Sequence, residues 1–181
     1  HGLSALLPGE SNRLSFPLGY WNGLAIFVAI GLPLLLRVSV DASWRWTRAL
    51  AVGAIPVFGS VIYLSSSRTG TLTAMVGALV MIVLSGRRWA VGVAVACGGA
   101  GSIVMYRVLS VRTSLTNGPL DGPVAVHQGR EAALALMVVA VATASAAALG
   151  SWLLIERFPP GRRVGQAVAA AAALACLTAV V

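Results

Sequence analysis

The sequence predicts an all-helical bundle that crosses a membrane about six times. Three observations lead to this prediction, and composition is the first. Hydrophobic residues make up 58% of the 181 residues, whereas charged residues make up only 10%. A soluble globular domain carries about 25% charged residues, so this chain cannot cover a water-facing surface. The second observation is that the apolar residues fall into runs of about 20, the length of a membrane-crossing helix.

The third observation is the distribution of positive charge. The net charge is +8, and all thirteen basic residues are arginines that stand singly or in pairs between the apolar runs. This distribution is typical of a multi-pass membrane protein and not of a nucleic-acid-binding protein. The lipid bilayer is therefore an expected partner, and nucleic acid is not. A soluble helical bundle is excluded as well, because its helices would be apolar along one stripe and not on every face.

Six apolar runs are the expected membrane spans. We expect Arg37 to end the first span and Pro33 to kink it. The second span contains Pro56, and only a short serine-rich turn separates it from the third, so these two form a tight hairpin. The six spans cover residues 18–36, 49–66, 69–85, 89–108, 132–155 and 163–181.

The fourth and fifth spans flank the longest polar stretch, which we predict to be a loop over residues 109–130. It contains Asn117-Gly118-Pro119 and Asp121-Gly122-Pro123, both strong turn signals. The sixth run is alanine-rich and still apolar at Val181. We therefore expect residues 1–181 to form a single transmembrane domain of a longer protein.

The arginines also predict the orientation in the membrane. One set of loops holds eight arginines and the other set holds five, and the richer side should face the cytoplasm. The eight are Arg37, Arg45, Arg48, Arg87, Arg88, Arg157, Arg162 and Arg163. The five are Arg13, Arg68, Arg107, Arg112 and Arg130. The tryptophans and tyrosines lie near the expected helix ends, where interfacial aromatic residues gather.

Small residues recur at intervals of four along three of the expected spans. Such residues let membrane helices approach closely, although an alanine-rich chain also produces this spacing by chance. They are Gly70, Ala74 and Ala78, then Ala94 and Gly98, then Ala140, Ala144 and Ala148. Cys97 and Cys176 lie inside apolar runs, so we expect buried small side chains and neither a disulfide nor a metal site.

The sequence contains no soluble catalytic motif, and we expect no metal and no cofactor. The acids lie at or beyond the ends of the expected spans. Cation-coupled transporters usually place an acid inside a span, so a transporter is disfavoured but stays an alternative.

Residues 65–70, Ser-Ser-Ser-Arg-Thr-Gly, connect the second and third spans. Ser67 is a good helix N-cap, and the N–H groups that follow it point outward. A helix N-terminus beside Arg68 is a natural anion site, and the guanidinium can bind a phosphate bidentately. The alternative is a capped hairpin whose arginine extends to the lipid headgroups.

Two further groups of polar residues lie on the same predicted side. Asn22, in the outer end of the first span, either hydrogen-bonds to another helix or lines a site. His127, Arg130 and Glu131 would share one face of a helix that starts near Pro123. His127 has the chemistry of a general base, but a solvated helix face is the alternative.

Two segments resemble the core of the O-antigen ligase-like superfamily. They are RLSFPLGYWNGLAIFVAIGLPLLLR and YLSSSRTGTLTAMVGALVMIVL, which together cover residues 13–85. In that family an arginine precedes a glycine- and asparagine-containing start of a span, here Arg13, Gly19 and Asn22. A later hairpin carries Ser-Arg, here Ser67 and Arg68. The alanine- and arginine-rich composition is similar to that of actinobacterial members.

The resemblance implies a multi-pass glycosyltransferase of the GT-C type in the cytoplasmic (inner) membrane. Such an enzyme moves a glycan from a polyprenyl diphosphate to an acceptor on the outer face, and it needs no metal. The resemblance also implies that Arg68, Arg13, Ser67 and Asn22 bind the diphosphate. It assigns no catalytic base, because the family's arginine- and histidine-rich outer loop would follow Val181. The chain alone is therefore expected to be inactive.

Two other functions stay open at this point. The first is a transporter or flippase for a lipid-linked or anionic solute, with the outer arginines as a gate for the substrate. The second is a non-catalytic membrane scaffold. A second, inverted set of helices in the parent protein would favour the transporter.

Overall fold

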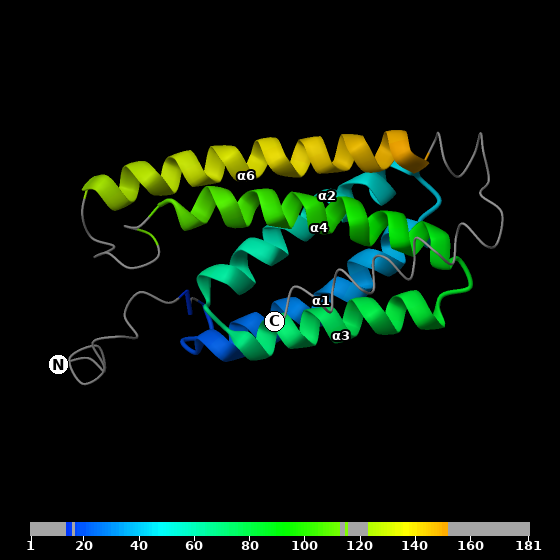
Figure 1. Ribbon diagram of the computed structural model, residues 1–181, viewed down its shortest axis with the longest axis horizontal. Helices are drawn as coiled ribbons and strands as arrows, with labels where there is room; N and C mark the ends of the chain where they lie inside the picture. The colour runs from blue at the N-terminus through cyan, green and yellow to red at the C-terminus, as the bar shows by residue number, and fades with distance from the viewer. Residues whose placement is uncertain (1–13, 16, 113–114, 116–122, 152–181) are drawn as a thin grey trace.

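The computed structural model describes residues 14–15, 17–112, 115 and 123–151. These residues form five helices (Figure 1) and contain no strand, so the predicted all-helical fold is confirmed for this part of the chain. The helices are α1 (Trp21–Asp41), α2 (Arg45–Leu64), α3 (Arg68–Leu84), α4 (Arg88–Ser110) and α6 (Pro123–Gly150).

Helices α1, α2, α4 and α6 are each long and apolar enough to cross a membrane, which indicates a membrane protein. Helix α3 is apolar but has 17 residues. At 1.5 Å per residue it measures about 25 Å, near the lower limit for a span. The predicted sixth span, residues 163–181, lies outside the described residues.

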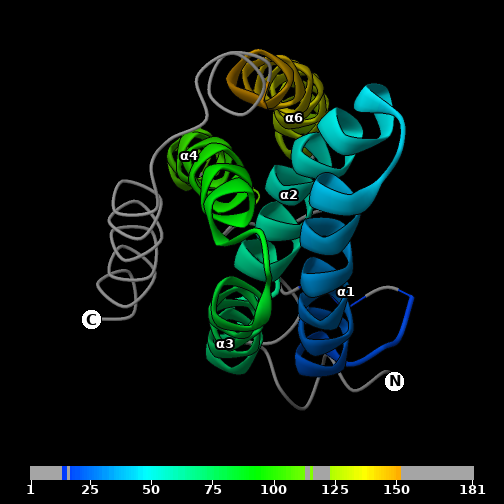
Figure 2. The ribbon, with the colours of Figure 1, turned by 90° about the vertical axis from the view of Figure 1, so that its right-hand side faces the viewer.

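Helix α2 occupies the centre of the bundle. It packs against α1, α4 and α6, and α3 lies along α1 (Figure 2). Successive helices run in alternating directions, so the bundle has two ends (Figure 1). The Arg68 end holds the starts of α1, α3 and α6 and the ends of α2 and α4. The Arg48 end holds the opposite termini of the same helices.

The first two helices extend beyond the apolar runs that predicted them. Helix α1 continues through Arg37 to Asp41, and these two side chains form an ion pair with Nε and Oδ2 2.5 Å apart. Helix α2 begins at Arg45, four residues before the apolar run. The Arg37–Asp41 pair, one turn apart, supports the last turn of α1, where hydropathy alone predicts no helix. Pro33 lies inside α1 without ending it.

The predicted loop over residues 109–130 is too long at both ends, whereas the helix expected to start near Pro123 is confirmed. Helix α4 continues to Ser110, and α6 begins at Pro123, nine residues before the predicted start at 132. Proline is favoured in the first turn of a helix because its fixed φ is already helical. The first turn of α6, Pro-Val-Ala-Val, is followed by a polar turn that an i, i+4 pair between His127 and Glu131 supports.

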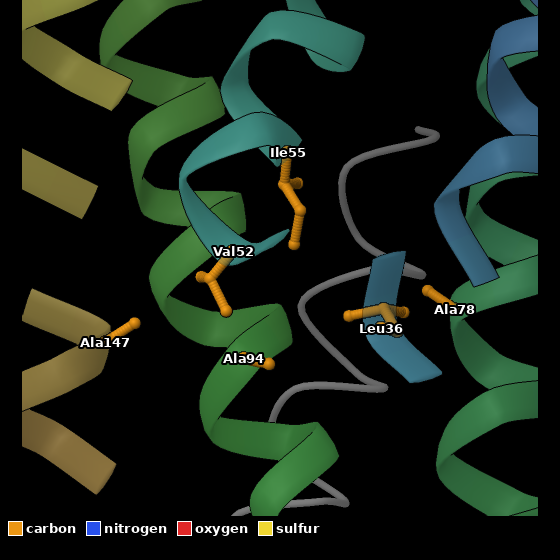
Figure 3. Close-up of a cluster of buried hydrophobic side chains, with 6 residues drawn as sticks. All are labelled: Leu36, Val52, Ile55, Ala78, Ala94 and Ala147. Carbon is orange, nitrogen blue, oxygen red and sulfur yellow. The ribbon is translucent and has the colours of Figure 1, made fainter. Parts of the chain in front are cut away.

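The core contains at least one side chain from every described helix. Leu36 of α1 and Ala78 of α3 meet residues of the other three helices (Figure 3). Half of this cluster is alanine, which allows the helix backbones to approach closely. The remaining members are Val52, Ile55, Ala94 and Ala147.

The small residues singled out in the sequence lie at helix contacts. A Cβ placed on Gly70 would be 2.5 Å from the Cβ of Ala25 in α1. A Cβ on Gly98 would be 2.6 Å from Cδ1 of Ile55 in α2. The alanine stripe of α6 meets α2, where Gly53 lies against Ala140 and Ala144. In these places the spacing marks genuine interfaces.

Candidate functional site

The described arginines divide between the two ends as the sequence grouped them. Arg68, Arg107, Arg112 and Arg130 belong to the Arg68 end. Arg37, Arg45, Arg48, Arg87 and Arg88 belong to the Arg48 end. Arg13, Arg157, Arg162 and Arg163 lie outside the described residues. The grouping is thus confirmed for nine arginines, and which end faces the cytoplasm stays a prediction.

The turn between α2 and α3 is fixed by its serines. Ser65 is fully buried and donates its hydroxyl to the carbonyl of Val61, 2.7 Å away. Ser67 is buried too, and its Oγ accepts a bond from the backbone N–H of Gly70 at 3.1 Å. The predicted N-cap is therefore confirmed. Ser66, between them, has a positive φ of 48°, which is uncommon for a residue other than glycine.

Arg68 is the first residue of α3, and its side chain is exposed. The first N–H groups of a helix have no partners within the helix, and the helix dipole places partial positive charge beside them. The guanidinium thus stands next to a second source of positive potential. Its exposure fits both hypotheses, an anion site and an arginine that extends to the headgroups.

Asn22 does not make the interhelical bond that was one of its two predicted roles. Its side-chain amide donates instead to the Tyr20 hydroxyl, 3.3 Å away and two residues before it. Ala25, about one turn further along α1, meets Gly70 of α3. Since α1 and α3 run in the same direction, Asn22 and Arg68 lie at one end of the same helix pair.

Arg13 lies outside the described residues, but the residue after it is placed. The backbone N–H of Leu14 donates to the carbonyl of Leu64 at 3.2 Å. Leu64 ends α2, three residues before Ser67. The two segments that carry the family resemblance therefore meet at the Arg68 end.

His127 and Glu131 pair on α6, with Nδ1 and Oε1 3.3 Å apart. The other carboxylate oxygen of Glu131 lies 3.5 Å from Nη2 of Arg112, just beyond the end of α4. His127 is 76% exposed. This cluster connects α6 to α4 and favours the solvated-face interpretation of His127. This role of Arg112 could not be predicted from the sequence, because its partner Glu131 belongs to a different helix.

An apolar cavity of about 420 Å³ lies among α1, α2, α3 and α4. Tyr63 and Tyr106 line it near the Arg68 end, and their rings meet edge to face with centroids 5.0 Å apart. Hydropathy gave no sign of this cavity, which depends on small residues facing one another. These include Gly59, Ala74, Ala78, Gly99 and Ser102.

The cavity and Arg68 share one face of α3. Thr71, Met75 and Ala78 line the cavity, and Arg68 precedes Thr71 by three residues. Residues three and four apart lie above one another on a helix, so Arg68 continues this stripe toward the helix N-terminus. On α1, Asn22 precedes the cavity residue Leu36 by 14 residues, close to four full turns. Arg68 and Asn22 thus lie toward the Arg68 end of the helices that line the apolar cavity.

No protein-family model matches the chain, and no curated protein or solved structure matches it. The resemblance to the O-antigen ligase-like superfamily therefore rests on the motif residues alone and stays a prediction.

Proposed function

We propose that the chain is the part of a membrane glycan ligase or polymerase that holds a polyprenyl-diphosphate-linked glycan. One observation carries the proposal. A helix N-terminus with an exposed arginine continues the stripe of residues that lines a 420 Å³ apolar cavity. A lipid-linked diphosphate has the matching parts, a long apolar chain and a compact anionic group.

The apolar half of the site would position the carrier without adding much affinity. Lipid tails are about as apolar as the cavity wall, so moving an isoprenoid chain from the bilayer into the cavity changes little free energy. The cavity instead restricts where the chain, and hence the diphosphate, is placed. Most of the binding free energy must then come from the headgroup.

The polar half supplies that free energy through Arg68. A guanidinium binds phosphate oxygens with two parallel, charge-assisted hydrogen bonds. Ser67 supports this geometry, because its cap fixes the first turn of α3. Negative charge develops on the diphosphate as the glycosidic bond breaks, and fixed cations stabilise that charge. By the resemblance, Arg13 and Asn22 would contribute from the start of α1.

The remaining parts of the proposal concern the parent protein. It would have about six spans in this region, a GT-C-type architecture, and a place in the cytoplasmic membrane with the Arg68 end outside. The catalytic base is unassigned. The exposed His127 pairs with Glu131 and stands in a cluster that connects two helices.

The cavity also bears on the alternative, a flippase for the same carrier. A flippase must pass the charged headgroup across the bilayer. Below Thr71 the cavity is walled almost entirely by apolar side chains down to Leu36, with the Ser102 hydroxyl as an exception. A diphosphate in such surroundings would lose its hydration without gaining partners, at a cost of several kcal/mol. This favours binding and transfer at the Arg68 end.

Photo-crosslinking tests the proposal. The chain is placed in nanodiscs with a polyprenyl diphosphate that carries a diazirine on an isoprene unit near the headgroup. We expect label on α3 between Thr71 and Ala78, competed by undecaprenyl diphosphate but not by undecaprenol. Arg68→Ala should lower the labelling by roughly tenfold or more, since charge-assisted bonds contribute about 1.5–3 kcal/mol.

Arg107→Ala is the matched control, because Arg107 is an exposed arginine in the last turn of α4 at the same end. It should label like the unaltered chain. Equal competition by undecaprenol, or unchanged labelling of Arg68→Ala, would contradict the proposal. If the polyprenyl diphosphate probe labels the chain as expected but the parent protein does not transfer glycan, the transporter would be favoured.

A further inference from the structure

A second cavity, of about 230 Å³, lies at the Arg48 end among α1, α2, α4 and α6. Its lining combines buried apolar residues with two arginines. Val52, Ala94 and Ala147 belong to the buried core cluster. Arg48 and Arg87 stand at the same cavity, together with the hydroxyl-bearing Ser39 and Ser151.

Backbone carbonyls at the end of α1 hold both guanidinium groups in place. Arg48 donates through Nε to the carbonyl of Ala42 at 2.6 Å. Arg87 donates through Nη1 to the carbonyl of Val40 at 3.4 Å. Each bond uses one of the five N–H donors of an arginine. Both residues line the cavity, and each guanidinium has further N–H donors that a ligand could use.

The charge at this end is strongly positive. Its described part contains five arginines and one acid, Asp41, which already pairs with Arg37. Helices α2 and α4 also begin here, and neither Trp44 nor Arg87 forms a side-chain cap at those starts. Their N-terminal dipoles add positive potential, whereas α1 and α6 end here and add negative potential. The arginines outweigh these opposing dipoles.

Two exposed tryptophans lie at the same end of the bundle as the cavity. Trp44 and Trp46, at the start of α2, are 72% and 77% exposed, as in an interfacial aromatic belt. Basic pockets between membrane helices at this depth suit anionic lipid headgroups. We propose that this cavity binds the phosphate of an anionic phospholipid, on the leaflet opposite the Arg68 end. The lipid's glycerol and upper acyl chain would meet the apolar lining, which a free phosphate ion would not use.

Native mass spectrometry of the 181-residue chain tests this site directly. The chain is released from mixed micelles that contain phosphatidylglycerol and phosphatidylcholine with identical acyl chains. We expect at least a fivefold preference for one molecule of phosphatidylglycerol. The double variant Arg48→Gln and Arg87→Gln should lose it. Arg88→Gln should keep it, because Arg88 is exposed at the same end but does not line the cavity.

A second variant separates binding from folding, since both arginines also support the end of α1. Ala90→Leu keeps both arginines and fills part of the cavity that Ala90 lines. It should lose the preference at unchanged helix content, measured by circular dichroism. A preference retained by Ala90→Leu or by the double variant would overturn the site. So would equal binding of the two lipids.

A phosphate group could reach this cavity on a lipid or on a soluble compound, and binding of inorganic phosphate distinguishes these two ligands. Added at millimolar concentration without lipid, it should not bind the chain saturably. Saturable phosphate binding that the double arginine variant abolishes would assign the cavity to a soluble phosphate compound and overturn the lipid assignment. None of these outcomes depends on the proposed glycan transfer.

Discussion

Ser66 is the described residue whose backbone departs most from the usual choice for its position. It follows the C-cap of α2 with φ at 48°, where glycine is the commonest residue. A side chain in this left-handed region costs about 1–2 kcal/mol. The turn tolerates this cost because Ser65 and Ser67 on both sides are buried and hydrogen-bonded. The left-handed residue lets α3 start directly after α2, with Arg68 at its first position.

Ser66→Gly should therefore stabilise the chain by about 1 kcal/mol, and Ser66→Val should destabilise it by a similar amount. The measurement is reversible unfolding in mixed micelles of increasing SDS fraction, followed by circular dichroism. Ser43→Gly, in the turn between α1 and α2, serves as the control and should not stabilise the chain. A stability unchanged by both Ser66 substitutions would show that the turn carries no strain.

Arg68 should be needed for function and dispensable for folding. In the parent protein, Arg68→Ala should lower glycan transfer by roughly ten- to a hundredfold, from the loss of about 1.5–3 kcal/mol. Arg68→Lys should recover little, because an ammonium group cannot form the planar bidentate contact. The measurement is glycan transfer in cells, normalised to the amount of protein in the membrane.

The control for Arg68 is Arg107→Ala and not Arg112→Ala. From the sequence the two arginines look equivalent, but the structure pairs Arg112 with Glu131. Loss of that pair would disturb the connection between α4 and α6. Full glycan transfer by Arg68→Ala at normal abundance would contradict the anion site. It would favour the alternative, an arginine that extends to the headgroups.

Between elements, the closest approach that bears on the site is the crossing of α1 and α3 at Gly70. An added Cβ there would meet the Cβ of Ala25 at 2.5 Å and its backbone carbon at 3.2 Å. Backbone atoms cannot move aside without shifting the helix. Gly70 also donates its N–H to the cap residue Ser67, so a shift would reach the start of α3.

Gly70→Ala should thus destabilise the chain by about 1–3 kcal/mol, as overpacking does in well-packed cores. Gly99→Ala is the matched change, since a Cβ at Gly99 in α4 meets nothing within 4 Å. It should be neutral or slightly stabilising, because alanine favours the helix. Unfolding in mixed micelles measures both variants. Equal stability of the two would contradict the close contact between α1 and α3.

Apolar run length predicted the existence of the five described helices but not all of their ends. The part of α6 before the predicted span has only a short apolar turn, residues 123–126, followed by polar residues. Its start depends on Pro123 and on the pair between His127 and Glu131. Hydropathy averages over windows and has no term for such side-chain pairs. The N-cap at Ser67 was predictable because capping is a local property of the sequence.

The two cavities could not be predicted in the same way. Each forms where small residues from different helices face one another, and that depends on helix rotation and crossing. The alternating arrangement of the chain did predict which arginines share an end. It could not predict that Arg48 and Arg87 would stand at one cavity, because they come from different helices.

The whole molecule has two ends of different chemistry. At the Arg68 end an exposed arginine and a capped helix start stand above a large apolar cavity. At the Arg48 end two arginines line a smaller cavity and donate to backbone carbonyls at the end of α1. The proposed functions assign these ends to opposite membrane surfaces. Glycan transfer outside the cell requires the Arg68 end to face outward.

The direct test of this central claim is cysteine labelling in intact cells with a membrane-impermeant maleimide. Cys97 and Cys176 are first replaced by alanine, which we expect to leave membrane levels nearly unchanged because both lie in apolar runs. Single cysteines are then placed at Ser66 and at Gly86, exposed positions at opposite ends of α3. Ser66→Cys should label in intact cells, and Gly86→Cys only after the cells are lysed. The reverse pattern, or labelling of both positions in intact cells, would contradict a bundle that spans the membrane with its Arg68 end outside.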